Sequence, residues 1–129
     1  MIEAKISFIN SHEGINLIEF TNEIQKFYML SLELDENIKI HQKVNLSFKS
    51  TECLIHKERL NTSFINEFYV KIEAIFQGKI ITIVRVKNEF CIFEAQISTK
   101  AFNNLNLTTN ECIYVYINPS SLFIKEYLC

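Results

Sequence analysis

The sequence of 129 residues contains few glycines and prolines, the residues that most often interrupt helices and strands. It has two glycines, one proline, no tryptophan and a single aspartate, Asp35, which excludes any mechanism that needs a pair of aspartates. It has no run of 18 apolar residues, and its start is charged and strand-like, so neither a membrane span nor a secretory leader is expected. We therefore expect a cytoplasmic protein that has no membrane partner.

Signatures of catalysis and metal binding are also missing. The sequence shows no phosphate-binding glycine loop, dinucleotide turn, zinc motif or nucleophile–base pattern. The three histidines lack metal-ligand spacing, and no CxxC pair occurs among Cys53, Cys91, Cys112 and Cys129. We expect reduced thiols that are buried as small hydrophobic residues. The sequence thus predicts a protein that is not an enzyme and that holds no metal and no organic cofactor.

The charge balance argues against a nucleic-acid binder. Thirteen basic and fifteen acidic side chains give a net charge of −2, whereas binding to nucleic acid requires a basic face that displaces counterions. A local positive pocket remains compatible with this balance. We expect no direct contact with nucleic acid.

Apolar residues make up 48% of the chain, and the eleven phenylalanines, five tyrosines and many isoleucines are typical of strands. Apolar and polar residues alternate in the segments 2–8, 44–48, 70–76, 91–97 and 113–117. This alternation indicates half-buried strands. Short helical turns are predicted only over 32–36 and 99–105, the second capped by Ser98 or Thr99.

Two repeats follow each other along the chain. "AKISFI" from Ala4 corresponds to "VKIEAI" from Val70, and "KSTECLI" from Lys49 corresponds to "NPSSLFI" from Asn118. The spacing drifts only from 66 residues early in the repeat to 69 residues near its end. The pattern predicts an all-β protein of two tandem, small, OB-like five-stranded barrels, residues 1–60 and 64–129, each with a short helical turn. Units of this size are marginally stable alone, so further packing is expected.

The order of short motifs resembles a known family. In the second half the family pattern is matched, in sequence, by Ser63 to Phe68, Ile97 to Ala101, Leu105, Leu107, Asn110, Ile113 and Ile117 to Leu122. In the first half the matching positions are Leu30-Ser31, Ile38, His41, Val44 and Phe48 to Thr51. These residues resemble the Mop, or TOBE, domain of molbindins. The tandem pair is similar to the ligand-binding region of molybdate-responsive transcription regulators.

The resemblance implies a protein that binds the oxyanions molybdate or tungstate for molybdenum homeostasis, by storage or by sensing. In the resembling family the sites lie at subunit or domain interfaces. The resemblance therefore implies a homo-oligomer, a dimer or a trimer, with a regulator or transporter as a further protein partner.

A compact dianion needs convergent backbone amides, hydroxyl groups and a cation. The turn Lys49-Ser50-Thr51 offers all three in consecutive residues. The further candidate ligand residues are Ser31, Ser63, Asn66, Ser98, Ser120 and Ser121.

Departures from the family pattern leave an alternative open. Ile65 stands at the position of the motif arginine, Asn118 replaces the turn lysine of the second repeat, and the first repeat starts without the leading motif. The alternative is a degenerate TOBE-like interaction module that has lost the ligand and docks a transporter or regulator protein.

Overall fold

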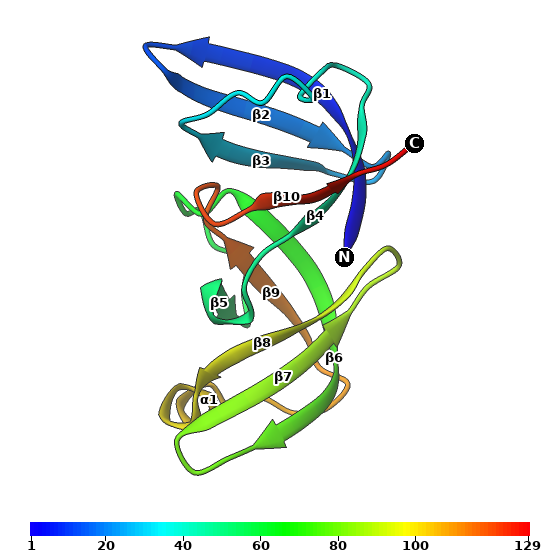
Figure 1. Ribbon diagram of the computed structural model, residues 1–129. Coiled ribbons are helices and arrows are strands. Elements are labelled where there is room, and N and C mark those ends of the chain that lie inside the picture. Colours follow the sequence, from blue (N-terminus) through cyan, green and yellow to red (C-terminus); the bar gives the residue numbers. More distant parts are fainter. The chain divides into compact units, whose positions relative to one another are not determined.

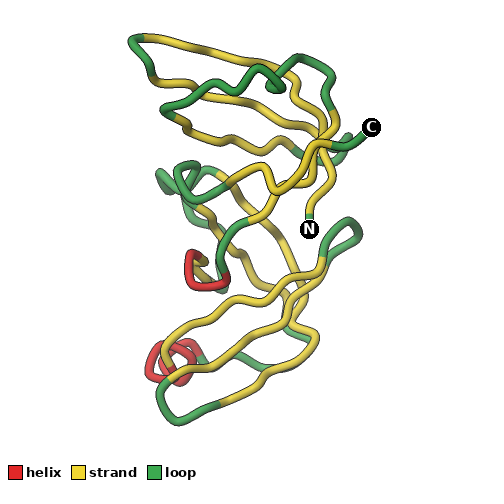
Figure 2. The backbone as a smooth tube through the Cα atoms, in the orientation of Figure 1, coloured by secondary structure: helices red, strands yellow, loops and turns green.

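Strands account for most of the chain, as the alternation predicts, and helix is confined to two short segments (Figure 2). The computed structural model describes residues 1–129. Its strands are β1 (Ile2–His12), β2 (Ile15–Thr21), β3 (Lys26–Ser31), β4 (Lys43–Ser47), β5 (Cys53–His56), β6 (Asn66–Gln77), β7 (Ile81–Lys87), β8 (Ile92–Ser98), β9 (Cys112–Ile117) and β10 (Phe123–Tyr127). The helices are a 3₁₀ turn, η1 (Ser50–Glu52), and an α-helix, α1 (Thr99–Leu105). No helix is long and apolar enough to cross a membrane.

One of the two predicted helical turns forms. Ser98 caps α1, its Oγ accepting a hydrogen bond from the Ala101 amide at 3.1 Å. The other prediction, over 32–36, is wrong, because local side-chain bonds hold that backbone in bends and turns. Ser31 Oγ bonds both peptide groups of Glu33, and Asp35 bonds the amide of Asn37 through its side chain.

The strands form two five-stranded antiparallel sheets (Figure 1). One has the order β10-β4-β1-β2-β3, and the other has the order β5-β9-β6-β7-β8. The chain divides into two compact units that correspond to these sheets. Unit 1 comprises residues 1–48, 64–66 and 118–129, and unit 2 comprises 49–63 and 67–117. The fold is therefore an all-β arrangement of two small OB-like units.

The last strand of each sequence repeat lies in the other unit. β5, which follows the first repeat's turn, pairs with β9, with Cys53 opposite Ile117. β10, which closes the second repeat, pairs with β4, with Phe123 opposite Ser47. The compact units thus do not share the boundaries 1–60 and 64–129, which describe the repetition in the sequence.

The two units repeat fine details of backbone geometry. A register shift follows Ile6 in β1, and an equivalent shift follows Ile72 in β6. His41 and Asn110, which hold equivalent places in the two repeats, both have positive φ, 74° and 73°. Their amides donate to the carbonyls of Ile6 and Ile72, each at 2.8 Å. The shared bulges and left-handed residues support a duplication.

Each unit has its own apolar core. The inward positions of β1, β2 and β3 bury residues such as Ile6, Phe20 and Phe27, and those of β6, β7 and β9 bury Ile72, Val86 and Val115. The four cysteines are unpaired. Only Cys91 is buried and Cys53 is half-buried, so the expectation that all four are buried is wrong for the exposed Cys112 and Cys129.

Candidate oxyanion site

The turn Lys49-Ser50-Thr51 leads from the core of unit 1 into unit 2. Lys49 is extended, with φ −78° and ψ 142°, and its carbonyl accepts the Glu52 amide at 2.9 Å, which closes η1. This places Ser50 and Thr51 at the start of a tight turn, and η1 packs beside β8.

The donors of this turn are free. No side chain caps η1, and the amides of Ser50 and Thr51 have no acceptor within the chain. The Lys49 side chain is exposed and its ammonium forms no ion pair. Two backbone amides, two hydroxyl groups and one cation thus remain available to an external acceptor, which is the donor set that a compact anion needs.

In the equivalent turn of unit 1, which starts at Asn118, the backbone amides are already bonded within the turn. The Asn118 side-chain oxygen accepts the Ser120 amide at 3.1 Å, and the Asn118 carbonyl accepts the Ser121 amide at 2.8 Å. Pro119 has no N–H to offer. Asparagine at position 118 therefore satisfies the turn internally, whereas the lysine at 49 cannot accept a hydrogen bond and leaves the amides open.

The remaining predicted residues are distributed over both units. Asn66 is fully buried, and its amide bonds both peptide groups of Tyr28, accepting from N at 2.7 Å and donating to O at 2.8 Å. Ser31 bonds Glu33, Ser98 caps α1, and Ser63 is exposed without a partner. Asn66 and Ser31 thus have structural contacts of their own, and their ligand roles remain predictions.

The structure brings some of these residues together along strand edges. In unit 1, Asn66 and the turn of Ser120 and Ser121 both meet the outer edge of β3, where the Leu30 amide donates to the Pro119 carbonyl at 3.0 Å. In unit 2, the Lys49 turn packs beside β8, the strand that ends at Ser98.

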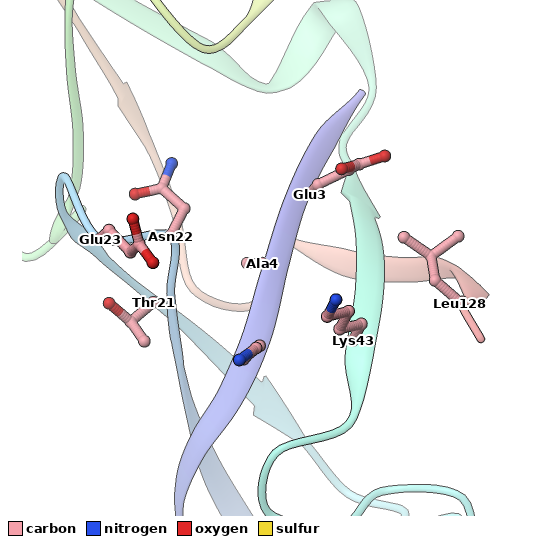
Figure 3. Close-up of a pocket in the computed structure, with 8 residues that line it drawn as sticks. Glu3, Ala4, Thr21, Asn22, Glu23, Lys43 and Leu128 are labelled. Atoms are coloured by element: carbon pink, nitrogen blue, oxygen red, sulfur yellow. The ribbon is translucent and has the colours of Figure 1, made fainter.

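Sequence reasoning missed a cleft in unit 1 (Figure 3). Its volume is about 430 Å³, and its lining residues are Glu3, Ala4, Lys5, Thr21, Asn22, Glu23, Lys43 and Leu128. Lys5 and Lys43 are direct partners across β1 and β4, and neither forms an ion pair. The buried Nδ2 of Asn22 has no acceptor. Only the strand register reveals this pairing of lysines, so the sequence carried no signal for it.

Two further features of the chain concern metal-ligating side chains and the partly or fully buried thiols. No group of three or more histidine, cysteine, aspartate or glutamate side chains is placed to hold a metal ion. Burial raises the pKa of the Cys53 thiol to about 12, with a smaller contribution from the Glu52 carboxylate, and burial also raises that of Cys91 to about 12. Both thiols remain protonated at neutral pH.

Comparison with known proteins finds a likeness in structure but not in sequence. No protein-family model and no curated protein matches the sequence. A similar solved structure is that of ModG, a cytoplasmic molybdate-binding protein, in a crystal form with molybdate bound. The match has a TM-score of 0.88 at 13% identity and covers 95% of this chain and 92% of that chain. At this identity the likeness establishes the fold, which extends over nearly the whole of both chains.

Proposed function

We propose that this protein binds a tetrahedral metal oxyanion, molybdate or tungstate, and serves molybdenum homeostasis in the cytoplasm by storing or sensing it. The proposal makes the protein a binding protein rather than an enzyme. Support comes from the fold, which it shares over 95% of its length with a molybdate-binding protein.

The observation that carries the proposal is the open turn at Lys49. A dianion requires donors that are not already bonded within the protein, since otherwise binding would break one hydrogen bond for each that it makes. The amides of Ser50 and Thr51 and the Lys49 ammonium meet this requirement, whereas the amides of the equivalent turn at Asn118 do not.

The turn covers one side of a tetrahedral ligand. The other oxygens of the anion require donors from a further surface, because one short turn cannot enclose four of them. We therefore propose that the functional form is a homo-oligomer, a dimer or a trimer, in which more than one surface contributes to each site.

The test is isothermal titration of the protein with molybdate and tungstate, with sulfate as the control anion. Saturable heat with the metal oxyanions but not with sulfate is expected. Lys49→Ala should weaken binding about 10- to 100-fold, the usual consequence of losing a charge-assisted hydrogen bond. Lys79→Ala is the matched control, because Lys79 is likewise exposed and forms no ion pair.

The outcomes separate the turn from the cleft. If Lys49→Ala binds like the wild type while Lys5→Ala loses affinity, the anion binds between Lys5 and Lys43 and the turn is not the site. Absence of heat at millimolar anion with folded protein would refute oxyanion binding altogether.

A further inference from the structure

The two units carry matching hairpins, which allows their strand edges to be compared residue by residue. Asn22 closes the β2–β3 turn and Asn88 closes the β7–β8 turn. Each asparagine side-chain oxygen accepts hydrogen bonds from two backbone amides. The backbone N–H of each asparagine donates to the carbonyl three residues later. Six residues beyond each asparagine lies an equivalent position, Tyr28 in β3 and Glu94 in β8. Both strands are the last in their sheets.

In unit 1 this edge position is covered. The Tyr28 amide and carbonyl point away from β2 and bond the side chain of Asn66, which mimics a neighbouring peptide group. The segment that carries Asn66, residues 64–66, belongs to unit 1, although the rest of β6 belongs to unit 2. The next outward amide of β3, that of Leu30, bonds the Pro119 carbonyl.

In unit 2 the same position is open. The equivalent register turns the Glu94 amide and carbonyl away from β7, and neither group has a partner within the chain. The Glu94 side chain does not cover them, because its carboxylate pairs with Arg85 at 2.9 Å. The neighbouring outward side chain, Ile92, is 54% exposed. The turn η1 packs beside β8, as the Pro119 turn lies beside β3, but no hydrogen bond joins it to the Glu94 peptide groups. Unpaired peptide groups at a strand edge are a template for an added extended segment.

We infer that the β8 edge at Glu94 is a docking site for an extended segment of another polypeptide, which presents an asparagine amide to the Glu94 peptide. The chemistry of the occupant is taken from the molecule itself, since Asn66 fills the equivalent place on β3. Strand-edge recognition of this kind derives affinity from main-chain bonds and specificity from alternate side chains. The inference does not rest on the oxyanion proposal, although the Lys49 turn packs beside the same strand.

The test uses a blocked synthetic peptide that copies residues 61–67, Asn-Thr-Ser-Phe-Ile-Asn-Glu, titrated into the ¹⁵N-labelled protein. Binding should shift the Glu94 amide resonance and slow its hydrogen exchange, while the Tyr28 amide, already bonded, stays unchanged. A peptide with alanine at the position of Asn66 should bind about 10-fold more weakly or worse, because it cannot make the two bonds.

Two protein variants sharpen the result. Glu94→Pro removes the outward N–H and should abolish binding, and proline is tolerated at an edge strand whose N–H faces outward. Glu94→Gln keeps the backbone donor and should bind the peptide as the wild type does. If Glu94→Pro fails to fold, the difference in affinity between the asparagine peptide and the alanine peptide still tests the inference.

Three results would overturn the inference. They are an unperturbed Glu94 amide at millimolar peptide, equal affinity for the alanine peptide, and a shift at Tyr28 in place of Glu94. The Glu94 amide could also become protected from hydrogen exchange without peptide as the protein concentration rises. That result would assign the edge to a second copy of this chain and not to a separate partner. A protein that binds the peptide but no oxyanion would leave this inference standing and refute the proposed function.

Discussion

Asn66 offers a direct test of how unit 1 is held together. Its side chain is fully buried and makes two short hydrogen bonds to the Tyr28 peptide, at 2.7 and 2.8 Å. Each such bond contributes about 0.5–1.5 kcal/mol net, and a partner left unsatisfied costs more when it is buried. Because Tyr28 is only half-buried, water replaces part of the loss. Asn66→Ala should therefore lower the free energy of unfolding by about 2–3 kcal/mol.

The Asn66→Asp variant distinguishes the bond to the Tyr28 amide from the bond to the Tyr28 carbonyl, because only the second depends on the protonation of the carboxyl group. An ionised carboxylate keeps the bond from the Tyr28 amide but sets a negative oxygen against the Tyr28 carbonyl, whereas a protonated carboxyl can donate to that carbonyl. Burial raises the pKa of such a carboxyl, because it disfavours the charged form. The variant should thus lose stability as pH rises through that raised pKa and regain most of it toward pH 4.

The assay is urea unfolding of wild type, Asn66→Ala and Asn66→Asp between pH 4 and pH 8, with Ser63→Ala as the control. Ser63 lies nearby in the sequence, is exposed and has no bond to lose. Hydrogen exchange at the Tyr28 amide should accelerate in Asn66→Ala and less so in Asn66→Asp. A loss below about 0.5 kcal/mol in Asn66→Ala, or an Asp variant with the pH profile of the wild type, would refute the role of these bonds.

Two further predictions concern unit 2 and the thiols. Tyr116→Phe should cost about 1–3 kcal/mol of unfolding free energy in urea, because the buried hydroxyl accepts the Leu60 amide at 2.7 Å and donates to Glu67 at 3.0 Å. An unchanged midpoint would exclude this network. A thiol reagent at pH 8 should modify Cys112 and Cys129 quickly and Cys53 and Cys91 only on unfolding. With their pKa values raised from 9.0 to about 12, the last two should also cause stability to fall as pH rises above 9. Rapid modification of all four thiols in folded protein would contradict both expectations.

The repeats and the strands could be read from the sequence because their signal is local. Alternation at 2–8 and 70–76 follows from one face being buried, and the capped helix at 99–105 follows from Ser98. The helical turn expected at 32–36 failed because Ser31 and Asp35 bond their own backbone, a competition that apolar patterning does not report.

The candidate site was predictable only in part. The residue types of the Lys49 turn indicated an anion donor set, but whether those donors are free depends on hydrogen bonds that no pattern shows. Asn118 and Lys49 hold equivalent places, yet only the structure shows that Asn118 satisfies its own turn. The pairing of Lys5 with Lys43 depends on strand register between residues far apart in the chain, which a single sequence does not specify.

The exchange of final strands predicts that neither repeat folds well alone. Residues 1–60 contain β5 without β9, its pairing partner, and contain β4 without β10. Residues 64–129 contain β9 without β5 and β10 without β4. Each fragment would also expose apolar surface, since Leu122 of the second repeat is buried in unit 1 and Ile55 of the first is buried in unit 2. Because units of about 60 residues are marginal even when complete, each fragment should lack a cooperative thermal transition or should associate with itself. Mixing the two fragments should restore the sheets and the transition, as followed by near-ultraviolet circular dichroism and sedimentation. Two fragments that each melt cooperatively as monomers near the temperature of the whole chain would show that the exchanged strands are dispensable.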